Sequence, residues 1–295
     1  MTFKRGFVRI IKEYGCRGKK IAVTGASGGI GVELCRLILA SGGELIVVDR
    51  NVKKQAALIE MLKGEFEGAK IEGELCDMST FTEVKSLADR LIKRDITDII
   101  LNAGAYNIPV SKSDTGCTNI FTINCIAPLY LARALLPTLK KNGGKAIAVG
   151  SIAHRYSHAD VDDIDFARCE KASRAYGNAK RYLMYAFFKM RQRGEPVVVA
   201  HPGITVTGMT SHYPEKLYKI IKYPMKVIFM RPKVACLSIF YSLFVTPLDR
   251  FWIGPAILDI WGWPEVSELR SCGSEEYEFI SETMQEILDM QEIDN

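Results

Sequence analysis

Short apolar runs alternate with longer amphipathic segments along most of this chain of 295 residues. Several of the short runs are almost continuously apolar, which is typical of parallel strands that are covered on both faces. The segments between them, such as 30–40 and 176–191, repeat apolar residues at helical spacing. This alternation predicts an α/β fold, in which a doubly wound parallel sheet carries helices on both faces. The predicted strands are Lys20–Thr24, Glu44–Asp49, Ala69–Cys76, Asp98–Asn102, Lys145–Gly150 and Pro196–Ala200.

The rhythm of strands and helices changes after about residue 205. Segment 212–233 is basic and apolar, segment 234–244 has helical spacing, and 256–260 is the last predicted strand. No linker rich in Pro, Gly or Ser interrupts the chain, so we expect a single domain. The expected organisation is a basic amphipathic segment at 1–19, the main domain at 20–270 and an acidic amphipathic helix at 271–295.

The net charge of +5 is concentrated at the N-terminus, where residues 1–20 hold seven Lys or Arg and one Glu. Nucleic-acid-binding proteins usually carry a broad basic stripe, so we expect no nucleic-acid partner. The apolar face of segment 1–19 leaves two interpretations: weak contact with a membrane surface, or packing on the domain or a partner subunit. We see neither a secretory signal nor an apolar run long enough to span a bilayer, which favours a cytoplasmic protein, at most peripheral to a membrane. The eight cysteines lack metal-ligand spacing, and we expect no metal.

A glycine-rich segment, TGASGGIG at 24–31, joins the first predicted strand to a helical pattern. Glycines in this place let the backbone turn tightly and approach a pyrophosphate, which then lies on the positive N-terminus of the helix. A glycine cluster alone is a weak indicator, and its position between the first strand and the first helix makes it more specific. The residues expected to contact a dinucleotide here are Gly25, Ser27, Gly28, Gly29, Ile30 and Gly31.

Asp49 ends the second predicted strand, 18 residues after Gly31. A carboxylate there can accept hydrogen bonds from both adenosine ribose hydroxyls and would repel the 2′-phosphate of NADP. Arg50 could pair with that phosphate, so the sequence favours NAD(H) and leaves NADP(H), or use of both, open. Asp77, followed by Met78 at the end of the third strand, could reach the adenine amino group.

Tyr176 and Lys180 lie four residues apart, which places a phenol and an ammonium on one helix face. The spacing YxxxK recurs at Tyr185–Lys189 and Tyr218–Lys222, but the first copy opens the helix that follows the fifth strand, and Ser151 ends that strand. The ligand crevice of an open α/β sheet lies at this edge. A phenol has a pKa of about 10, and a nearby Lys⁺ together with an oxidised nicotinamide would lower it, so we expect Tyr176 to transfer a proton at neutral pH. Ser151 would then bind the substrate oxygen.

Two amide side chains complete the expected site. Asn102 ends the fourth strand in an Asn-Ala-Gly turn, where it could hold the loop against the adenine pocket. Asn124 lies in an apolar helical segment, where it could support a water molecule that links Lys180 to solvent. The structural alternative for Asn124 is a polar residue that satisfies a helix carbonyl.

These motifs, taken together and in this order, resemble those of the short-chain dehydrogenase/reductase family over roughly residues 18–265. The resemblance implies a Rossmann-type sheet, an oxidoreductase acting on CH–OH groups with NAD(P), and a catalytic group formed by Ser, Tyr, Lys and Asn. It also implies cofactor contacts from the Pro-Gly turn and from a threonine near the carboxamide. The residues that carry it are TGASGGIG, Asn102, Ala103, Gly104, Asn124, Ser151, Tyr176, Lys180, Pro202, Gly203 and Thr207.

A closer likeness is carried by GSIAHR (150–155), DIDFA (163–167) and GPAILDIWGWPE (254–265), which are similar to the retinol-dehydrogenase-like subgroup. That subgroup often prefers NADP, a preference that Asp49 opposes, and the hydrophobic N-terminal anchor common in it is missing. The basic, apolar part of 205–233 falls where the family places its substrate lid. We therefore expect a bulky apolar secondary alcohol or ketone, with a hydroxysteroid or bile acid as the leading class and a retinol-type or other lipophilic alcohol as the alternative.

A second class of function is a dinucleotide-sensing binding protein that keeps the fold and lacks the chemistry. The retained Ser, Tyr, Lys and Asn favour the enzyme, and the glycine spacing disfavours an epimerase or lyase. The family resemblance also implies a homo-oligomer. The acidic tail, with eight acidic and no basic residues from 275 to 294, is expected to dock on the domain or on another subunit.

Overall fold

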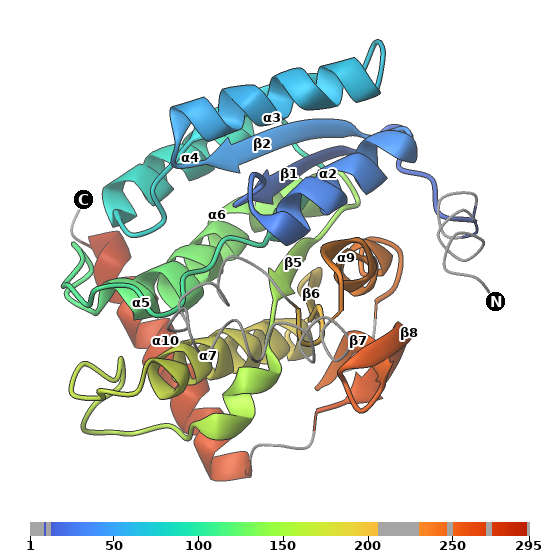
Figure 1. Cartoon of the computed structure of the whole chain (residues 1–295). Coiled ribbons are helices and arrows are strands. Elements are labelled where there is room, and N and C mark those ends of the chain that lie inside the picture. Colours follow the sequence, from blue (N-terminus) through green and yellow to red (C-terminus); the bar gives the residue numbers. More distant parts are fainter. Residues whose placement is uncertain (1–8, 10–12, 206–229, 247–249, 270–272, 294–295) are drawn as a thin grey trace, which may run out of the picture.

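In a computed structural model, the chain forms an α/β domain built on one sheet (Figure 1). The structure describes residues 9, 13–205, 230–246, 250–269 and 273–293. Thr207, most of the expected lid and most of the N-terminal segment therefore lie outside the described residues. The strands of the sheet are β1 (Lys20–Thr24), β2 (Glu44–Asp49), β3 (Ile71–Leu75), β4 (Asp98–Leu101), β5 (Ala146–Val149), β6 (Val197–Ala200), β7 (Phe251–Ile257) and β8 (Trp261–Glu268).

The described strands lie in the order β3-β2-β1-β4-β5-β6-β7-β8, and every neighbouring pair is parallel except β7 and β8. Helices cover both faces, so the predicted doubly wound fold is confirmed. The chain reverses its direction of winding between β1 and β4, and ligands of such sheets bind outside the carboxyl ends of strands at this point. The helical elements are α2 (Gly29–Ala40), α3 (Val52–Glu65), α4 (Phe81–Lys93), α5 (Asn119–Phe121), η1 (Thr122–Ile126), α6 (Ala127–Lys141), η2 (Ile152–Tyr156), α7 (Ala172–Gln192), α9 (Pro232–Tyr241) and α10 (Ser274–Ile293).

The predicted last strand, 256–260, is wrong in its bounds. The structure has two antiparallel strands here, and the middle of the predicted strand is the turn between them. Leu258 and Asp259 occupy this turn with φ of +54° and +58°. Pro255 and Pro264 pair across the hairpin and interrupt the apolar alternation, which is why the sequence pattern showed one short strand.

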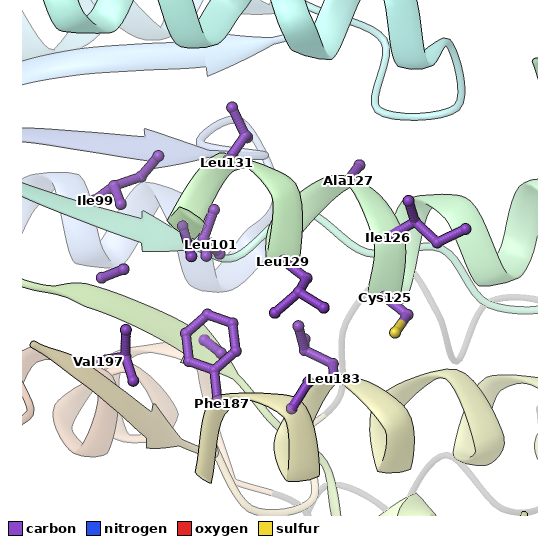
Figure 2. Packing of buried hydrophobic residues seen from close by; sticks show 14 of the residues in the cluster. Ile99, Leu101, Cys125, Ile126, Ala127, Leu129, Leu131, Leu183, Phe187 and Val197 are labelled. Carbon is purple, nitrogen blue, oxygen red and sulfur yellow. The ribbon is translucent and has the colours of Figure 1, made fainter. Parts of the chain in front are cut away.

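The core on one face of the sheet is formed by α6 and α7 packing against the central strands (Figure 2). Leu129 from α6 and Leu183 and Phe187 from α7 are almost fully buried beside Leu101 of β4. Helix α7 therefore has a rigid position relative to the carboxyl edge of the sheet. The first turns of α7, which contain Tyr176 and Lys180, take their position from this packing.

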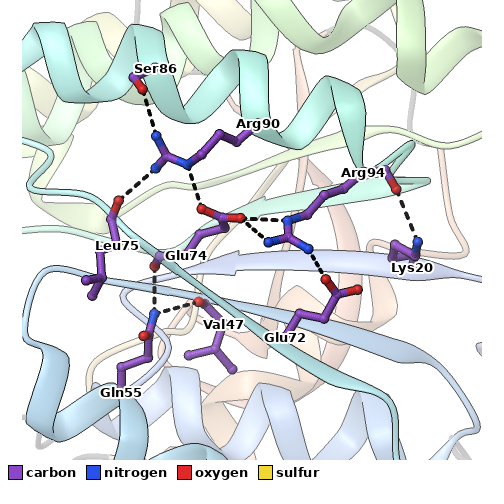
Figure 3. A network of polar contacts seen from close by, with 9 residues as sticks. All are labelled: Lys20, Val47, Gln55, Glu72, Glu74, Leu75, Ser86, Arg90 and Arg94. Carbon is purple, nitrogen blue, oxygen red and sulfur yellow. Dashed lines mark hydrogen bonds and ion pairs between the residues drawn. The ribbon is translucent and has the colours of Figure 1, made fainter.

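A network of charged side chains fixes the outer strand β3 to α4 (Figure 3). Glu74 is buried and accepts hydrogen bonds from Arg90, at 2.6 Å, and from Arg94, also at 2.6 Å. Arg94 also pairs with Glu72, and Gln55 of α3 donates to the backbone oxygen of Glu74 at 2.6 Å. The network therefore connects α3 and α4 to the outer strand β3.

One helical stretch among the described residues, Asn119–Lys141, is long and apolar enough to cross a membrane by length and composition alone. The sequence had suggested no such segment. It spans α5, η1 and α6, and 72% of its apolar window is buried inside the domain. Its packing under the sheet is that of a core helix of a globular domain.

Candidate active site

The loop after β1 is tied to the end of β4 at the point where the sheet reverses its winding. The Asn102 side chain donates to the backbone oxygens of Thr24, at 3.0 Å, and Gly25, at 3.1 Å. In return, the Thr24 hydroxyl accepts a hydrogen bond from the backbone of Ala103 at 3.0 Å. Asn102 therefore fixes the β1–α2 loop to the end of β4, and its place beside an adenine stays a prediction.

Two glycines of the loop are needed for close backbone contacts. Gly25 has φ of +62°, and a Cβ there would lie 2.9 Å from the Cα of Ala103. A Cβ at Gly31 would lie 2.4 Å from the backbone oxygen of Gly25, which any larger residue would displace. The loop therefore packs tightly on the start of α2, whose first turn holds no acidic residue. This arrangement suits an anionic group at the helix N-terminus.

A pocket opens beside this loop. Asp49 borders it and is 8% exposed, with its carboxylate accepting hydrogen bonds from the backbone and hydroxyl of Ser27, both at 2.8 Å. Burial raises the pKa of Asp49, while the Ser27 hydrogen bonds oppose that shift. Arg50 is largely exposed and lies 4.0 Å from Asp77. The lining residues are Thr24, Gly25, Val48, Asp49, Arg50, Cys76, Asp77, Met78, Ala103, Gly104, Ala105 and Ile123.

The pocket gathers seven of the residues that the sequence assigned to a dinucleotide: Gly25, Asp49, Arg50, Asp77, Met78, Ala103 and Gly104. Glycines that approach the backbone closely, a helix N-terminus without acids, and a carboxylate at the end of β2 fit the pyrophosphate and ribose of such a cofactor. Ile30, which the sequence also assigned to the cofactor, has its side chain buried in the core below the loop.

Lys180 and Tyr176 lie in the first turns of α7. They face the other end of the same carboxyl edge of the sheet. Lys180 is 2% exposed and donates to the backbone oxygen of Val149, at the end of β5, at 2.9 Å. Its Nζ lies 5.9 Å from the centre of the Tyr176 ring, and Tyr106 meets that ring edge-on at 5.6 Å. Burial lowers the pKa of Lys180 to about 8.

Ser151 stands at the start of η2, where its hydroxyl accepts a hydrogen bond from the backbone of Ala153 at 3.2 Å. Burial raises the pKa of Tyr176 to about 12, and a hydrogen bond with the Ser151 side chain pulls it back down. The sequence led us to expect a lowered pKa with Lys180 and an oxidised nicotinamide nearby. In the chain by itself, the cost of burying the phenolate outweighs the groups that favour it, and the lowered pKa stays a prediction for the cofactor-bound protein.

Asn124 is fully buried in η1, a short π-helical segment between α5 and α6. Its side chain donates to the backbone oxygens of Ala105, at 2.8 Å, and Ile120, at 2.9 Å. A Cβ at Gly104 would lie 2.9 Å from the Asn124 Oδ1 and 3.8 Å from the Lys180 Nζ. Gly104, which also lines the nucleotide pocket, therefore joins the two ends of the expected site. Widened helical turns of this kind are frequent at functional sites.

The Pro-Gly turn after β6 lies against the tip of the β7–β8 hairpin. Gly203 has φ of +74°, and a Cβ there would lie 2.6 Å from the backbone oxygen of Ile260. Its backbone nitrogen donates to the Nδ1 of His201 at 3.3 Å. Sequence reasoning placed Pro202 and Gly203 in the site, but it assigned no role to His201 or to Asp259 of the hairpin tip. The sequence offered one indication for each residue: His201 directly precedes the Pro-Gly turn, and Asp259 lies within GPAILDIWGWPE (254–265).

Comparisons with known proteins point the same way. A family model described as short chain dehydrogenase matches residues 19–162. Human polyprenol dehydrogenase is 24% identical over 243 residues, which are 78% of this chain and 69% of that protein. Human retinol dehydrogenase 13 is 26% identical over 203 residues, which are 66% of this chain and 61% of that protein, less than two thirds of its length.

Solved structures share the fold at low sequence identity. An uncharacterised protein from Mycobacterium paratuberculosis has a TM-score of 0.69 and 18% identity, covering 92% of this chain and 95% of that one. L-sorbose reductase from Gluconobacter frateurii, solved with NADPH and L-sorbose, has a TM-score of 0.63 and 19% identity, covering 78% and 90%. At this identity the likeness establishes the fold alone.

The doubly wound sheet, with its glycine loop at the switch point and a Tyr-Lys pair on the same edge, defines an NAD(P)-dependent oxidoreductase that acts on CH–OH groups. More narrowly, residues 19–162 match the family model described as short chain dehydrogenase, and the similar proteins include polyprenol and retinol dehydrogenases.

Proposed function

We propose that the protein interconverts a lipophilic alcohol and its carbonyl compound, with Tyr176 as the residue that transfers the proton. The observation that carries the proposal is the convergence of four side chains on one edge of the sheet. Tyr176 and Lys180 come from α7, Ser151 from the end of β5 and Asn124 from η1. Gly104 brings Asn124 and Lys180 within reach of the nucleotide pocket.

In the oxidative direction Tyr176 takes the proton of the substrate hydroxyl, and in the reductive direction it returns a proton to the carbonyl oxygen. The nicotinamide of a bound NAD(P) supplies the other half of the chemistry by accepting or giving a hydride. Ser151, whose side chain lowers the pKa of Tyr176, holds the substrate oxygen beside the phenol. With a pKa of about 8, Lys180 is mostly charged at neutral pH and favours the phenolate. Asn124 supports the proton path from Lys180 to solvent.

Glycines of the β1–α2 loop, Asp49, Arg50 and Asp77 would hold the nucleotide half of the cofactor, with Asn102 fixing the loop. We propose NAD(H) as the preferred form because a buried carboxylate at the end of β2 disfavours a 2′-phosphate. NADP(H) is the alternative, since Arg50 is exposed beside the pocket and several structural neighbours were solved with NADP or NADPH. Pro202, Gly203 and Thr207 are proposed to contact the nicotinamide end.

The substrate class rests on the relatives and on the residues around Tyr176. Polyprenol and retinol, in the names of the similar proteins, are long isoprenoid alcohols, and they support a lipophilic substrate. They point to an isoprenoid alcohol more directly than to the hydroxysteroid or bile acid that the sequence favoured. Tyr106, edge-on to Tyr176, adds an aromatic wall that suits an apolar molecule.

Turnover of the purified protein, followed by nicotinamide absorbance with NAD(H) and NADP(H), tests the proposal. The substrate panel contains a polyprenol, a retinoid, hydroxysteroids and short alcohols. We expect oxidation of a lipophilic member, and a loss of at least about 100-fold in Tyr176→Phe with cofactor binding retained. Tyr185→Phe, on the same helix in another YxxxK copy, is the matched control and should keep turnover.

Full activity in Tyr176→Phe would contradict the proposed chemistry. Cofactor binding without turnover on any substrate would favour the dinucleotide-sensing alternative. A strong preference for short polar alcohols would refute the lipophilic substrate. Further proposals carried over from the sequence are a cytoplasmic location with peripheral membrane contact, and assembly into a homo-oligomer.

A further inference from the structure

The short helical turn η2, which begins directly after Ser151, is held on one side by the tip of the β7–β8 hairpin. Arg155 in η2 donates to the carboxylate of Asp259 in the hairpin tip at 2.6 Å. The other oxygen of Asp259 lies 3.6 Å from the Nε2 of His201, which stacks flat on Trp252 at 3.8 Å. Asp259 therefore links η2 to the Pro-Gly turn that follows His201.

The backbone of the hairpin tip is strained at Asp259 and at the residue before it. Leu258 and Asp259 both have positive φ, a conformation that suits Gly or Asn and is costly for Leu. Ile260 closes the two-residue turn with a hydrogen bond to the backbone oxygen of Ile257 at 2.9 Å. Burial acts to raise the pKa of Asp259, but the contact with His201 and the hydrogen bond from Arg155 together outweigh it and lower the pKa. The carboxylate therefore stays ionised, and its contacts offset part of the strain.

On its other side, η2 is held by the acidic C-terminal helix. Glu276 of α10 accepts two hydrogen bonds from the guanidinium of Arg181, each at 2.6 Å, and one from the backbone of Ala159 at 2.8 Å. Arg181 is 1% exposed and donates to the backbone oxygen of His154, inside η2, at 3.0 Å. It directly follows Lys180 in α7, and Figure 1 shows α10 running beside that helix.

We propose that Asp259 and Glu276 are positioning residues of the reaction, which together set the place of the Ser151 turn relative to Tyr176. One carboxylate acts through Arg155 and the other through Arg181. Neither touches the reacting atoms. The proposal rests on the proposed function, and it gives the C-terminal hairpin and helix a role in the chemistry beyond their packing.

The proposal makes a claim about the pH dependence of the reaction. Tyr176 faces Ser151 of the serine turn, Lys180 of its own helix and Tyr106 of the loop after β4. The hydrogen bond with Ser151 lowers the Tyr176 pKa. If the turn moves away, that hydrogen bond weakens, the pKa rises, and oxidation needs a higher pH to reach the same rate. A purely structural role would lower the rate equally at every pH.

The test compares Asp259→Asn, Glu276→Gln and the double variant with the wild type, in full-length protein. Glu278→Gln is the control, because Glu278 lies on the same helix in an exposed pair with Lys189. We expect kcat for oxidation to fall about 10-fold to 100-fold in each single variant, because small misplacements of reacting groups are costly. The pH profile should shift to higher pH, with little change in the dissociation constant of NAD(H) measured by fluorescence.

Thermal unfolding identifies any variant that does not fold. Asp259→Asn removes a partly exposed pair and keeps the proposal testable if Glu276→Gln, at a buried pair, fails to fold. Asp259→Glu or Glu276→Asp should restore part of the activity. Folded variants with a lower kcat but an unmoved pH profile, or with wild-type kcat, would overturn the proposal. If wild-type turnover survives Tyr176→Phe, the proposed function itself fails, and the two failures are therefore distinguishable.

Discussion

Lys180 is a buried ammonium group whose burial costs the fold stability. Its side chain is almost fully buried, and burial lowers its pKa from 10.5 to about 8. Below pH 8 the protein keeps the buried ammonium charged at a cost that the unfolded chain does not bear. The four-residue spacing of Tyr176 and Lys180 was readable from the sequence. The raised pKa of Tyr176 was not, because the extent of burial depends on residues far apart along the chain.

Replacing Lys180 with Met should therefore stabilise the fold at neutral pH while abolishing turnover. The unfolded state binds more protons between about pH 8 and pH 10.5, so the penalty is complete below 8 and disappears as the pH rises. We expect Lys180→Met to gain about 1–2 kcal/mol at pH 7, after the lost hydrogen bond to Val149 is counted. Denaturant unfolding at pH 7 and pH 10 measures this. A variant that is less stable than the wild type at pH 7 would show that Lys180 is better satisfied than its burial indicates.

At the scale of elements, the sequence predicted the parallel strands β1–β6, and all of them except the half-exposed outer strand β3 are almost continuously apolar because they are covered on both faces. It missed the β7–β8 hairpin and the π-helical segment η1 that holds Asn124. Their determinants are the positive φ of Leu258 and Asp259 and the contacts of a buried amide, and neither leaves a periodic pattern in the sequence. The nucleotide pocket was predictable because its residues fall at the ends of recognisable strands. The carboxylates that hold the serine turn were not, since their partners are more than 90 residues away.

The ion-pair network of β3 and α4 gives a stability test with an internal control. Glu74 is buried between Arg90 and Arg94, whereas Glu72 pairs with Arg94 at a more exposed position. Glu74→Gln should lower the free energy of unfolding by about 1–3 kcal/mol, since the arginines are partly solvated and recover some of the loss. Glu72→Gln should change it by less than about 1 kcal/mol. Denaturant unfolding measures the free energy of unfolding of both variants. Equal losses in the two variants would mean that the burial of Glu74 adds nothing to the stability of the fold.

For the whole molecule, the main question left by the sequence was where the acidic C-terminal segment docks. Its apolar face predicted docking on the domain or on another subunit. The structure places α10 on its own domain, where Tyr277, Ile280 and Met284 join the core formed by α6 and α7. Its acidic residues pair with cations of those helices, as Asp289 does with Arg133 at 2.8 Å. Amphipathicity alone cannot distinguish the two partners, because both offer an apolar surface.

Removing α10 tests whether this helix is part of the fold or an appendage. Each of its buried apolar side chains contributes about 1.5–3 kcal/mol, and Tyr277, Ile280, Met284 and Leu288 are all buried. Their sum is comparable to the whole stability of a typical domain, which is about 5–15 kcal/mol. A chain that ends at Gly273 should therefore aggregate or unfold on expression, whereas one that ends at the exposed Met290 should remain soluble. Size-exclusion chromatography and circular dichroism measure both. A folded, soluble chain ending at Gly273 would show that the sheet and its remaining helices form a complete core without α10.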